Sequence, residues 1–338
     1  MNSIRIKNHS LQIQKMKKQI VLFISLLLLL SQAQGQSLKK LDFKVVGYYS
    51  LKAAMTADLK TVPFDKLTHI NLSFLNPDTL GNFNQDLSAL EPFIKAAHKH
   101  GVKVLPSIAG GGRHEYYHKL LRDENRARFI NDLLLISLKY NFDGIDVDIE
   151  GSDIDENYEN FVVGLANVLK PHKKLITSAI AIFYKDQLSD RALAQYDFMT
   201  LMSYDHTGPW RPSKPGPHST YEHAQADLDY FRTVRNIPKE KIVLGVGFYG
   251  YGFGPELTSK ASSMNYGQIV KTFPGAEKTD QITMPDGQIM YYNGEDTMRK
   301  KTLLAKENAS GIMIWQILGD AAGDRSLLGL INRVAYTQ

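Results

Sequence analysis

The sequence contains no cysteine in its 338 residues. This absence excludes disulfide bonds, thiolate metal sites and lipidated cysteines. Long apolar runs are also scarce, and the run at Ile20–Leu30 is interrupted by Ser25. Its 11 residues are too few to span a bilayer comfortably, which argues against a stable membrane anchor.

Most of the chain has no excess of basic over acidic residues. The formal net charge of +5 arises within residues 1–35, which hold five basic residues and no acidic one. The remainder carries 35 basic and 35 acidic residues. A balanced chain gives no reason to expect nucleic acid or an anionic membrane as a partner.

Residues 1–35 have the three parts of a secretory signal peptide. Met1–Lys18 is basic and polar, the apolar run follows, and Ala33-Gln34-Gly35 is a small-x-small cleavage site. A buried core helix is the alternative, but the polar segment Ser31–Lys40 follows too abruptly for one. We therefore predict cleavage near Gly35 and secretion to the extracellular or periplasmic space.

Residues 41–338 alternate between apolar strand-like segments and helical patterns. The expected strands span 43–50, 67–75, 102–108, 142–150, 175–183, 198–204, 242–248 and 311–318. Helical patterns span 87–100, 123–140, 156–169, 221–235, 295–308 and 326–334. This alternation favours one α/β domain, a (β/α)8 TIM barrel, which typically needs roughly 250 residues. A doubly wound open sheet is the alternative, but no Gly-rich phosphate loop follows the first strand.

Between barrel strands 7 and 8, the segment Gln281–Asn293 contains an Asp-Gly turn flanked by β-type runs. Such a turn is a hairpin signal. We therefore expect at most a small hairpin insertion at this point of the barrel.

The stretch 142–150, Phe-Asp-Gly-Ile-Asp-Val-Asp-Ile-Glu, has the two-residue period of a strand. This period places Asp146, Asp148 and Glu150 on one face and apolar residues on the other. Neighbouring carboxylates repel and raise one another's pKa, so the row adds no stability. A solvated antiparallel strand is the alternative. The flanking helices instead indicate a parallel sheet, where such a row would be buried unless it lines an opening at the end of the strands. We therefore predict a chemical site.

The spacing Asp143-x-x-Asp146-x-Asp148-x-Glu150 resembles the DxxDxDxE signature of glycoside hydrolase family 18, the chitinases and endo-β-N-acetylglucosaminidases. Weaker matches at other strands extend the resemblance over most of the chain after the first forty residues. The resemblance implies a glycosidase that acts on a polysaccharide or oligosaccharide containing N-acetylglucosamine. We predict no cofactor.

Active residues of such barrels lie at the C-terminal ends of the strands. The resemblance implies that Tyr48 hydrogen-bonds the acidic row, with a packing aromatic as the alternative. Ser107 is similar to the serine of the SxGG motif, although Ala109 replaces its first glycine. Met202-Ser203-Tyr204-Asp205 fits the MxYD pattern, whose phenol and carboxylate can hold a substrate amide. We assign substrate binding to Tyr48, Ser107, Met202 and Asp205.

Tryptophan is scarce, and both copies are candidates for sugar contact. The resemblance places Trp315 beneath the sugar at the reacting subsite, although a lone Trp is more often a core residue. Trp210 could line a neighbouring subsite or only hold its loop. His206 and His218 lie near this loop but lack the close spacing of a zinc site, so we predict no metal.

Asp148 and Glu150 approach a substrate from the same side, unlike the acid and nucleophile of an ordinary retaining glycosidase. The resemblance implies a substrate-assisted mechanism instead, in which Glu150 protonates the glycosidic oxygen and the 2-acetamido carbonyl attacks. Asp148 would hold the acetamido N–H, Asp146 would share a proton with Asp148, and Tyr204 would position the carbonyl. Like charges along the row would keep Glu150 protonated near neutral pH.

Departures from the family pattern leave the substrate open. Many chitinases have Trp before the acid and Tyr-Pro after it, whereas this chain has Ile149 and Gly151-Ser152, and Tyr251 stands where Arg is usual. Hydrolysis of β-1,4 linkages in chitin or chito-oligosaccharides is our first expectation. Cleavage of the chitobiose core of N-glycans is the second. A non-hydrolytic chitin-binding lectin is the third, but such proteins usually lose the acid that Glu150 retains.

Overall fold

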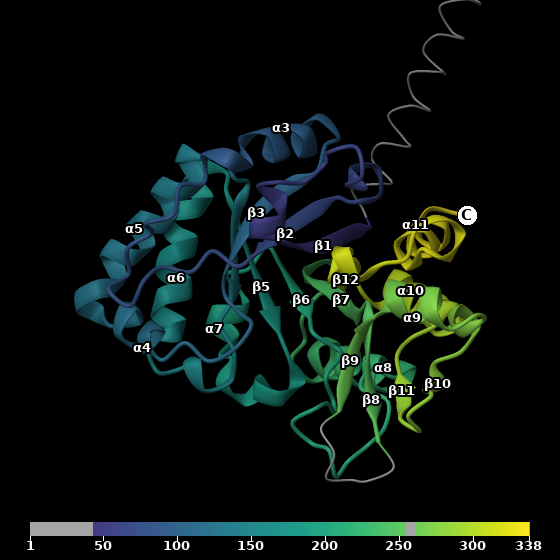
Figure 1. Cartoon of the computed structure of the whole chain (residues 1–338). Coiled ribbons are helices and arrows are strands. Elements are labelled where there is room, and N and C mark those ends of the chain that lie inside the picture. Colours follow the sequence, from purple (N-terminus) through teal and green to yellow (C-terminus); the bar gives the residue numbers. More distant parts are fainter. Residues whose placement is uncertain (1–42, 255–260, 338) are drawn as a thin grey trace, which may run out of the picture. The chain divides into compact units, whose positions relative to one another are not determined.

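A computed structural model describes residues 43–254 and 261–337, and the predicted signal peptide at 1–35 lies outside them. Within the described residues, eight parallel strands form a closed barrel in the order β1-β12-β7-β6-β5-β4-β3-β2 (Figure 1). These strands are β1 (Lys44–Ser50), β2 (His69–Ser73), β3 (Lys103–Ala109), β4 (Gly144–Asp148), β5 (Leu175–Ile180), β6 (Phe198–Leu201), β7 (Ile242–Gly247) and β12 (Gly311–Trp315). The predicted (β/α)8 barrel is confirmed.

Helices cover the outside of the barrel (Figure 1). The longer ones are α3 (Glu91–Lys99), α5 (Asp123–Lys139), α6 (Tyr158–Leu169), α8 (Tyr221–Asp229), α10 (Glu295–Asn308) and α11 (Leu327–Tyr336), and the shorter ones are α2 (Leu51–Ala54), α4 (Tyr116–Leu121), α7 (Asp190–Leu193) and α9 (Tyr266–Thr272). Local signals set their ends: Thr220 caps α8 by accepting a hydrogen bond from the His223 N–H. Across the described part of the chain, no helix is both long and apolar enough to cross a bilayer.

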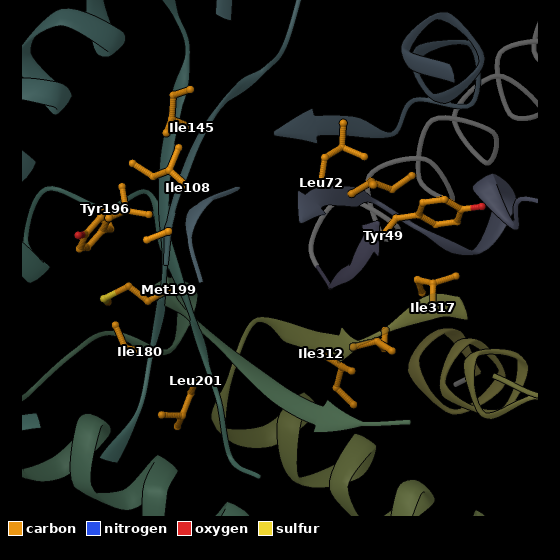
Figure 2. Packing of buried hydrophobic residues seen from close by; sticks show 14 of the residues in the cluster. Tyr49, Leu72, Ile108, Ile145, Ile180, Tyr196, Met199, Leu201, Ile312 and Ile317 are labelled. Carbon is orange, nitrogen blue, oxygen red and sulfur yellow. The ribbon is translucent and has the colours of Figure 1, made fainter. Parts of the chain in front are cut away.

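The two faces of each barrel strand bury different side chains. Outward-facing apolar residues pack beneath the helices, and Figure 2 shows Ile108, Ile145 and Ile180 of this cluster on β3, β4 and β5. Inside the barrel, Tyr48 and Met313 belong to a second, smaller apolar cluster. The inward face of β4 carries acids, so the predicted separation of its apolar and acidic faces is confirmed.

The insertion between β7 and β12 is larger than the hairpin we predicted. Four strands of the described chain form an antiparallel sheet in the order β10-β11-β8-β9. They are β8 (Tyr249–Phe253), β9 (Ser262–Asn265), β10 (Gln281–Thr283) and β11 (Ile289–Tyr291). The predicted hairpin is β10 and β11. Strand β8 was missed because glycine is depleted in strands, yet a Cβ on Gly250 would lie 2.5 Å from the Tyr291 carbonyl oxygen, so this pairing requires glycine.

Candidate active site

Asp146 is the innermost member of the acidic row. Strand pairing places Ser107 of β3 and Thr177 of β5 beside it. Its carboxylate accepts hydrogen bonds from the hydroxyls of Tyr48 (2.6 Å), Ser107 (2.8 Å) and Thr177 (2.6 Å). Burial raises the pKa of Asp146, and these hydroxyls partly lower it again. The carboxyl group is thus held in place by donors from β1, β3 and β5.

Tyr48 and Ser107 face Asp146 and are closed off from solvent. Their exposed fractions are 1% and 0%, and both hydroxyls donate to the Asp146 carboxylate. The hydrogen bond from Tyr48 to the acidic row, which the resemblance implied, is present. The assignment of both residues to direct substrate binding stays a prediction.

Asp148 lies one step closer to the barrel mouth. It is 3% exposed, and its Oδ1 has no hydrogen-bond partner among the described residues. Burial raises the pKa of Asp148 well above its usual value, and the charges of Glu150 and Asp146 raise it further. An unpaired polar atom at such a depth costs about 1–3 kcal/mol, so Asp148 is prepared for a partner that a ligand supplies.

Gly110 provides the space beside Asp148. Its φ is +60°, and a Cβ there would lie 2.2 Å from Phe74 Cε1 and 2.7 Å from Asp148 Oδ2. The Gly110 N–H donates to the Asp148 carbonyl oxygen at 2.8 Å. Both the left-handed backbone and the close contacts therefore require glycine at this position.

Glu150 follows β4 in an extended conformation, with φ −123° and ψ 152°. It lines a cavity of about 360 Å³ together with Met202, Tyr204 and Asp205. Burial raises the pKa of Glu150 to about 7, and the charges of Asp205 and Asp153 add to this effect. A carboxylic acid that keeps its proton near neutral pH beside a cavity is suited to general acid catalysis.

The like charges that raise the pKa of Glu150 also come from outside the acidic row. The charge of Glu150 raises the pKa of Asp148, whereas Glu150 itself is opposed by Asp205 and Asp153 from neighbouring loops. Crowding within the row thus raises the pKa of Asp148, and acids from neighbouring loops raise the pKa of Glu150.

The residues after β6 reach the same cavity. Tyr204 is 6% exposed, and its hydroxyl lies 4.0 Å from the Met313 sulfur, a weak acceptor. Asp205 has a φ of +62°, which turns the chain out of the strand. Its carboxylate accepts a hydrogen bond from the Tyr249 hydroxyl at 2.6 Å. Met202, Tyr204 and Asp205 thus gather around Glu150, as predicted from the MxYD spacing.

The two tryptophans lie in different surroundings. Trp315, at the end of β12, packs against Tyr48 with 5.2 Å between ring centroids and stacks on Phe74 at 5.7 Å. Trp210 is 54% exposed and packs edge to face on Tyr251 of the insertion at 5.8 Å. Trp210 is not among the residues that line the cavity with Glu150, so its contact with substrate stays a prediction.

The histidines near Trp210 have structural partners. His206 Nε2 lies 3.1 Å from Asp227 Oδ2, and its ring stacks on His223. His218 Nδ1 lies 3.4 Å from Asp205 Oδ1. No group of three His, Cys, Asp or Glu side chains suited to a metal occurs in residues 43–254 and 261–337.

The first acid of the DxxDxDxE spacing lies away from the cavity. Asp143 precedes β4, where its Oδ2 accepts a hydrogen bond from the Val104 N–H at 2.7 Å and pairs with His98 Nε2 at 2.8 Å. The side chain therefore joins β3, β4 and α3 at the opposite end of the strand. Asp143 therefore has a structural role.

Several residues of the site, some beneath the acidic row and some in the cavity wall, were missed by sequence reasoning. Thr177 could have been found, because the alternation of Leu175–Phe183 points it inward beside the acidic row. Arg113, Phe183 and Tyr184 lie in irregular segments after β3 and β5, where no periodicity indicates direction. These segments complete the wall of the cavity around Glu150.

Comparisons with known proteins agree with this geometry. The family model "Glycosyl hydrolases family 18" matches residues 44–320. Among solved structures, the chitinase ChiB from the chitin utilization locus of Flavobacterium johnsoniae is 32% identical with a TM-score of 0.78, covering 87% of this chain and 94% of that one. A chitinase from Bacteroides thetaiotaomicron is 29% identical with a TM-score of 0.75, covering 87% of this chain and 97% of that one.

Among curated proteins, a chitinase-like effector from Moniliophthora perniciosa is 30% identical over 260 residues, covering 66% of this chain and 58% of that protein. Probable chitinase 2 of Drosophila melanogaster is 25% identical over 280 residues, covering 66% of this chain and 57% of that protein. The chain therefore spans somewhat more than half the length of these curated relatives. With the family match over 44–320, the closed barrel and the acidic row at β4, the chain belongs to glycosyl hydrolases family 18.

Proposed function

We propose that the chain hydrolyses β-1,4 linkages between N-acetylglucosamine units of chitin or chito-oligosaccharides by substrate-assisted retaining catalysis. The observation that carries this proposal is the pair formed by Glu150 and Asp148. Glu150 borders the cavity with a pKa of about 7, and Asp148 presents an unpaired carboxyl oxygen next to it. Glu150 supplies a proton, and the unpaired oxygen of Asp148 can accept a hydrogen bond from the substrate.

In the first half-reaction, Glu150 gives its proton to the glycosidic oxygen as the bond from that oxygen to C1 breaks. The carbonyl oxygen of the substrate's 2-acetamido group attacks C1 and forms an oxazolinium ion. Asp148 accepts the acetamido N–H and stabilises the growing positive charge, while the Tyr204 hydroxyl donates to the carbonyl. Asp146 can share the proton of Asp148 as that charge develops.

In the second half-reaction, the ionised Glu150 takes a proton from water as the water oxygen attacks C1. The oxazolinium opens, and the 2-acetamido group is restored. Two inversions at C1 give net retention of configuration, and a substrate without the N-acetyl group lacks the internal nucleophile. Because both steps use the same carboxyl group, Glu150 ends the cycle protonated again.

The direct test is turnover of chromogenic chitobiosides and chitotriosides by the purified chain. We expect release of the chromophore from these substrates and none from the matching cellobioside, because glucose units carry no acetamido group. NMR of the first product should show the β-anomer. Equal turnover of the cellobioside would contradict substrate assistance, and inversion would contradict the mechanism.

The pH profile tests the surroundings of Glu150. Asp153 is buried, accepts the His114 N–H at 2.5 Å, and lies 3.8 Å from Arg113 Nε and 3.6 Å from His118 Nε2. Replacing Asp153 by Asn removes a charge that opposes ionisation of Glu150, so the pKa of Glu150 falls. A general acid works while protonated. The alkaline limb of kcat/KM, expected near pH 7, should therefore move to lower pH.

A suitable control is Asp324→Asn, which removes an acid from an exposed turn after β12. This variant should keep the wild-type limb when both are measured in the same buffers. An unchanged limb, or one moved to higher pH, in Asp153→Asn would show that Asp153 does not influence the acid.

The chitobiose core of N-glycans is the second candidate substrate. The observation behind this candidate is Tyr251, which stands where Arg is usual in the family and packs against Trp210. Product analysis on chitotetraose and on a high-mannose glycoprotein separates the two substrates. Retention on chitin without release of soluble sugar would instead indicate a lectin.

We further propose that the mature chain acts outside the cytoplasm. The support is the order of basic, apolar and small-residue segments within 1–35. Expression of the full chain followed by N-terminal sequencing tests this. We expect protein from the medium or periplasm to begin just after Gly35, and intact protein confined to the cytoplasm would contradict the proposal.

A further inference from the structure

Lys301 is a buried lysine that the mechanism above does not use. It lies on α10 with an exposed fraction of 0%. Its Nζ donates hydrogen bonds to the Ser219 carbonyl oxygen at 2.9 Å, to the Ser219 hydroxyl at 2.7 Å and to Asn293 Oδ1 at 2.8 Å. Lysine is almost never fully buried unless it is paired, and apolar replacements of buried ionic groups are often neutral for stability. These contacts therefore indicate a role for Lys301 besides packing.

The hydrogen bonds around Lys301 require its charged form. Asn293 Nδ2 donates to the carbonyl oxygens of Ser219 and Tyr292, so the Oδ1 atom is the acceptor that faces the lysine. The Ser219 hydroxyl donates its one hydrogen to the Ser203 carbonyl oxygen at 2.7 Å, so it can only accept from Nζ. Three donated bonds use all three hydrogens of an ammonium group. Burial lowers the pKa of Lys301 to about 7, so the ammonium form predominates below pH 7.

The segment that contains Ser219 holds the backbone before and after Tyr204. On one side, the Ser219 hydroxyl binds the Ser203 carbonyl oxygen. That carbonyl belongs to the planar peptide group that joins Ser203 to Tyr204, so its direction fixes where the tyrosine begins. On the other side, the His206 N–H donates to the His218 carbonyl oxygen at 3.0 Å. The two bonds therefore set the path of the backbone at Tyr204, which lines the cavity.

This backbone needs to be held because the residue after Tyr204 is strained. Asp205 has a φ of +62°, a left-handed conformation that is uncommon for residues other than glycine and persists only where the surroundings enforce it. Lys301 binds both oxygen atoms of Ser219 and so fixes the side-chain rotamer that aims the hydroxyl at the Ser203 carbonyl. The lysine is thus the anchor behind the hydrogen bond that precedes the strained turn.

We infer that Lys301 is a positioning residue for catalysis: its ammonium group fixes Ser219, and Ser219 holds the backbone that places the Tyr204 hydroxyl. The inference rests on the proposed function, in which that hydroxyl donates to the acetamido carbonyl. Lys301 touches no reacting atom and lies behind the cavity wall. Its contribution should therefore appear in kcat rather than in KM, because the acetamido carbonyl must be aligned for attack in the transition state.

The test is a double-mutant cycle that combines Ser219→Ala with Tyr204→Phe, measured below pH 7, where Lys301 is charged. Ser219→Ala removes only the hydroxyl that links the lysine to the Ser203 carbonyl. We expect kcat on the chromogenic chitobioside to fall about 10-fold and KM to change less than about twofold, because a misplacement of about 1 Å can cost up to about 100-fold in rate. In the Tyr204→Phe background no hydroxyl is left to place, so the same change should lower kcat by less than about twofold.

The matched control is Ser310→Ala. The Ser310 hydroxyl also donates to a backbone carbonyl oxygen, that of Ile242 at 3.0 Å, and also accepts from a lysine, Lys44 Nζ at 3.0 Å. It lies at the start of β7, at the end of the barrel opposite the mouth. We expect similar decreases in Tm for Ser219→Ala and Ser310→Ala, but wild-type kcat for Ser310→Ala.

Lys301→Met removes the ammonium group itself and should show the same loss of kcat and the same dependence on Tyr204. An unchanged kcat in Ser219→Ala would overturn the inference. Equal losses in both backgrounds, with Tyr204→Phe itself impaired, would overturn the inference alone, because the hydrogen bonds would then act elsewhere than on Tyr204. Full activity of Tyr204→Phe would contradict the role of this residue in the proposed function, and the inference with it.

Discussion

Replacing Glu150 by Gln is expected to lower the turnover of chito-oligosaccharides by at least about 1,000-fold, within the range that loss of a general acid produces. Gln keeps the size and shape of the side chain but has no acidic proton to transfer. The rate is measured by release of soluble sugar from chitotetraose. Binding should persist, because the cavity walls are unchanged, and calorimetric titration of the variant with chitotetraose measures it.

The control for this variant is Glu156→Gln, which makes the same change at an exposed position of the same loop region. It should hydrolyse chitotetraose at the wild-type rate. Near-wild-type hydrolysis by Glu150→Gln would remove Glu150 from the role of acid. Loss of binding together with turnover would show that the variant disturbs the site rather than the chemistry.

Replacing Asp148 by Asn is expected to reduce kcat by about 100-fold or more, the usual effect of removing a group that stabilises charge in the transition state. Asn fills the same space beside Gly110 but carries no negative charge to oppose the positive charge of the oxazolinium. The measurement is kcat on the chromogenic chitobioside across a pH series. A loss below about tenfold would argue against assistance by the acetamido group.

Asp143→Asn is the matched control for Asp148→Asn, because both change an acid of the same motif, one just before β4 and one at its end. Asp143 contacts the Val104 N–H and His98 at the far end of β4. We expect a lower Tm and a kcat close to that of the wild type. A large loss of kcat in Asp143→Asn, measured at a temperature where the variant stays folded, would contradict the assignment of a structural role to Asp143.

The acidic row could be predicted from the sequence because strand alternation is a local property. Once Ile145 and its neighbours are assigned to the helix side, Asp146 and Asp148 must point into the barrel. Eight strand patterns alternating with helices then determine the barrel, and the barrel brings the end of β6 to the same mouth. This reasoning placed Tyr204 beside Glu150 without coordinates.

Other parts of the site depend on contacts that no local pattern encodes. The turn at Gly151, with a φ of +53°, brings Asp153 back towards Glu150. Tyr184 enters the cavity from a segment without regular periodicity. Tyr48 was predicted to contact the row, but its depth followed only from packing against Trp315 and Asp146. Sequence reasoning therefore located the acidic row, but it missed how deeply Tyr48 is buried and which loop residues line the cavity.

The exposure of the row increases outward, from Asp146 at 0% and Asp148 at 3% to the partly exposed Glu150. Bulk water therefore reaches the outermost carboxyl directly, while the two inner carboxyls are shielded by the residues around them. Buffer can therefore set the protonation of the outermost group before each cycle without any opening of the barrel.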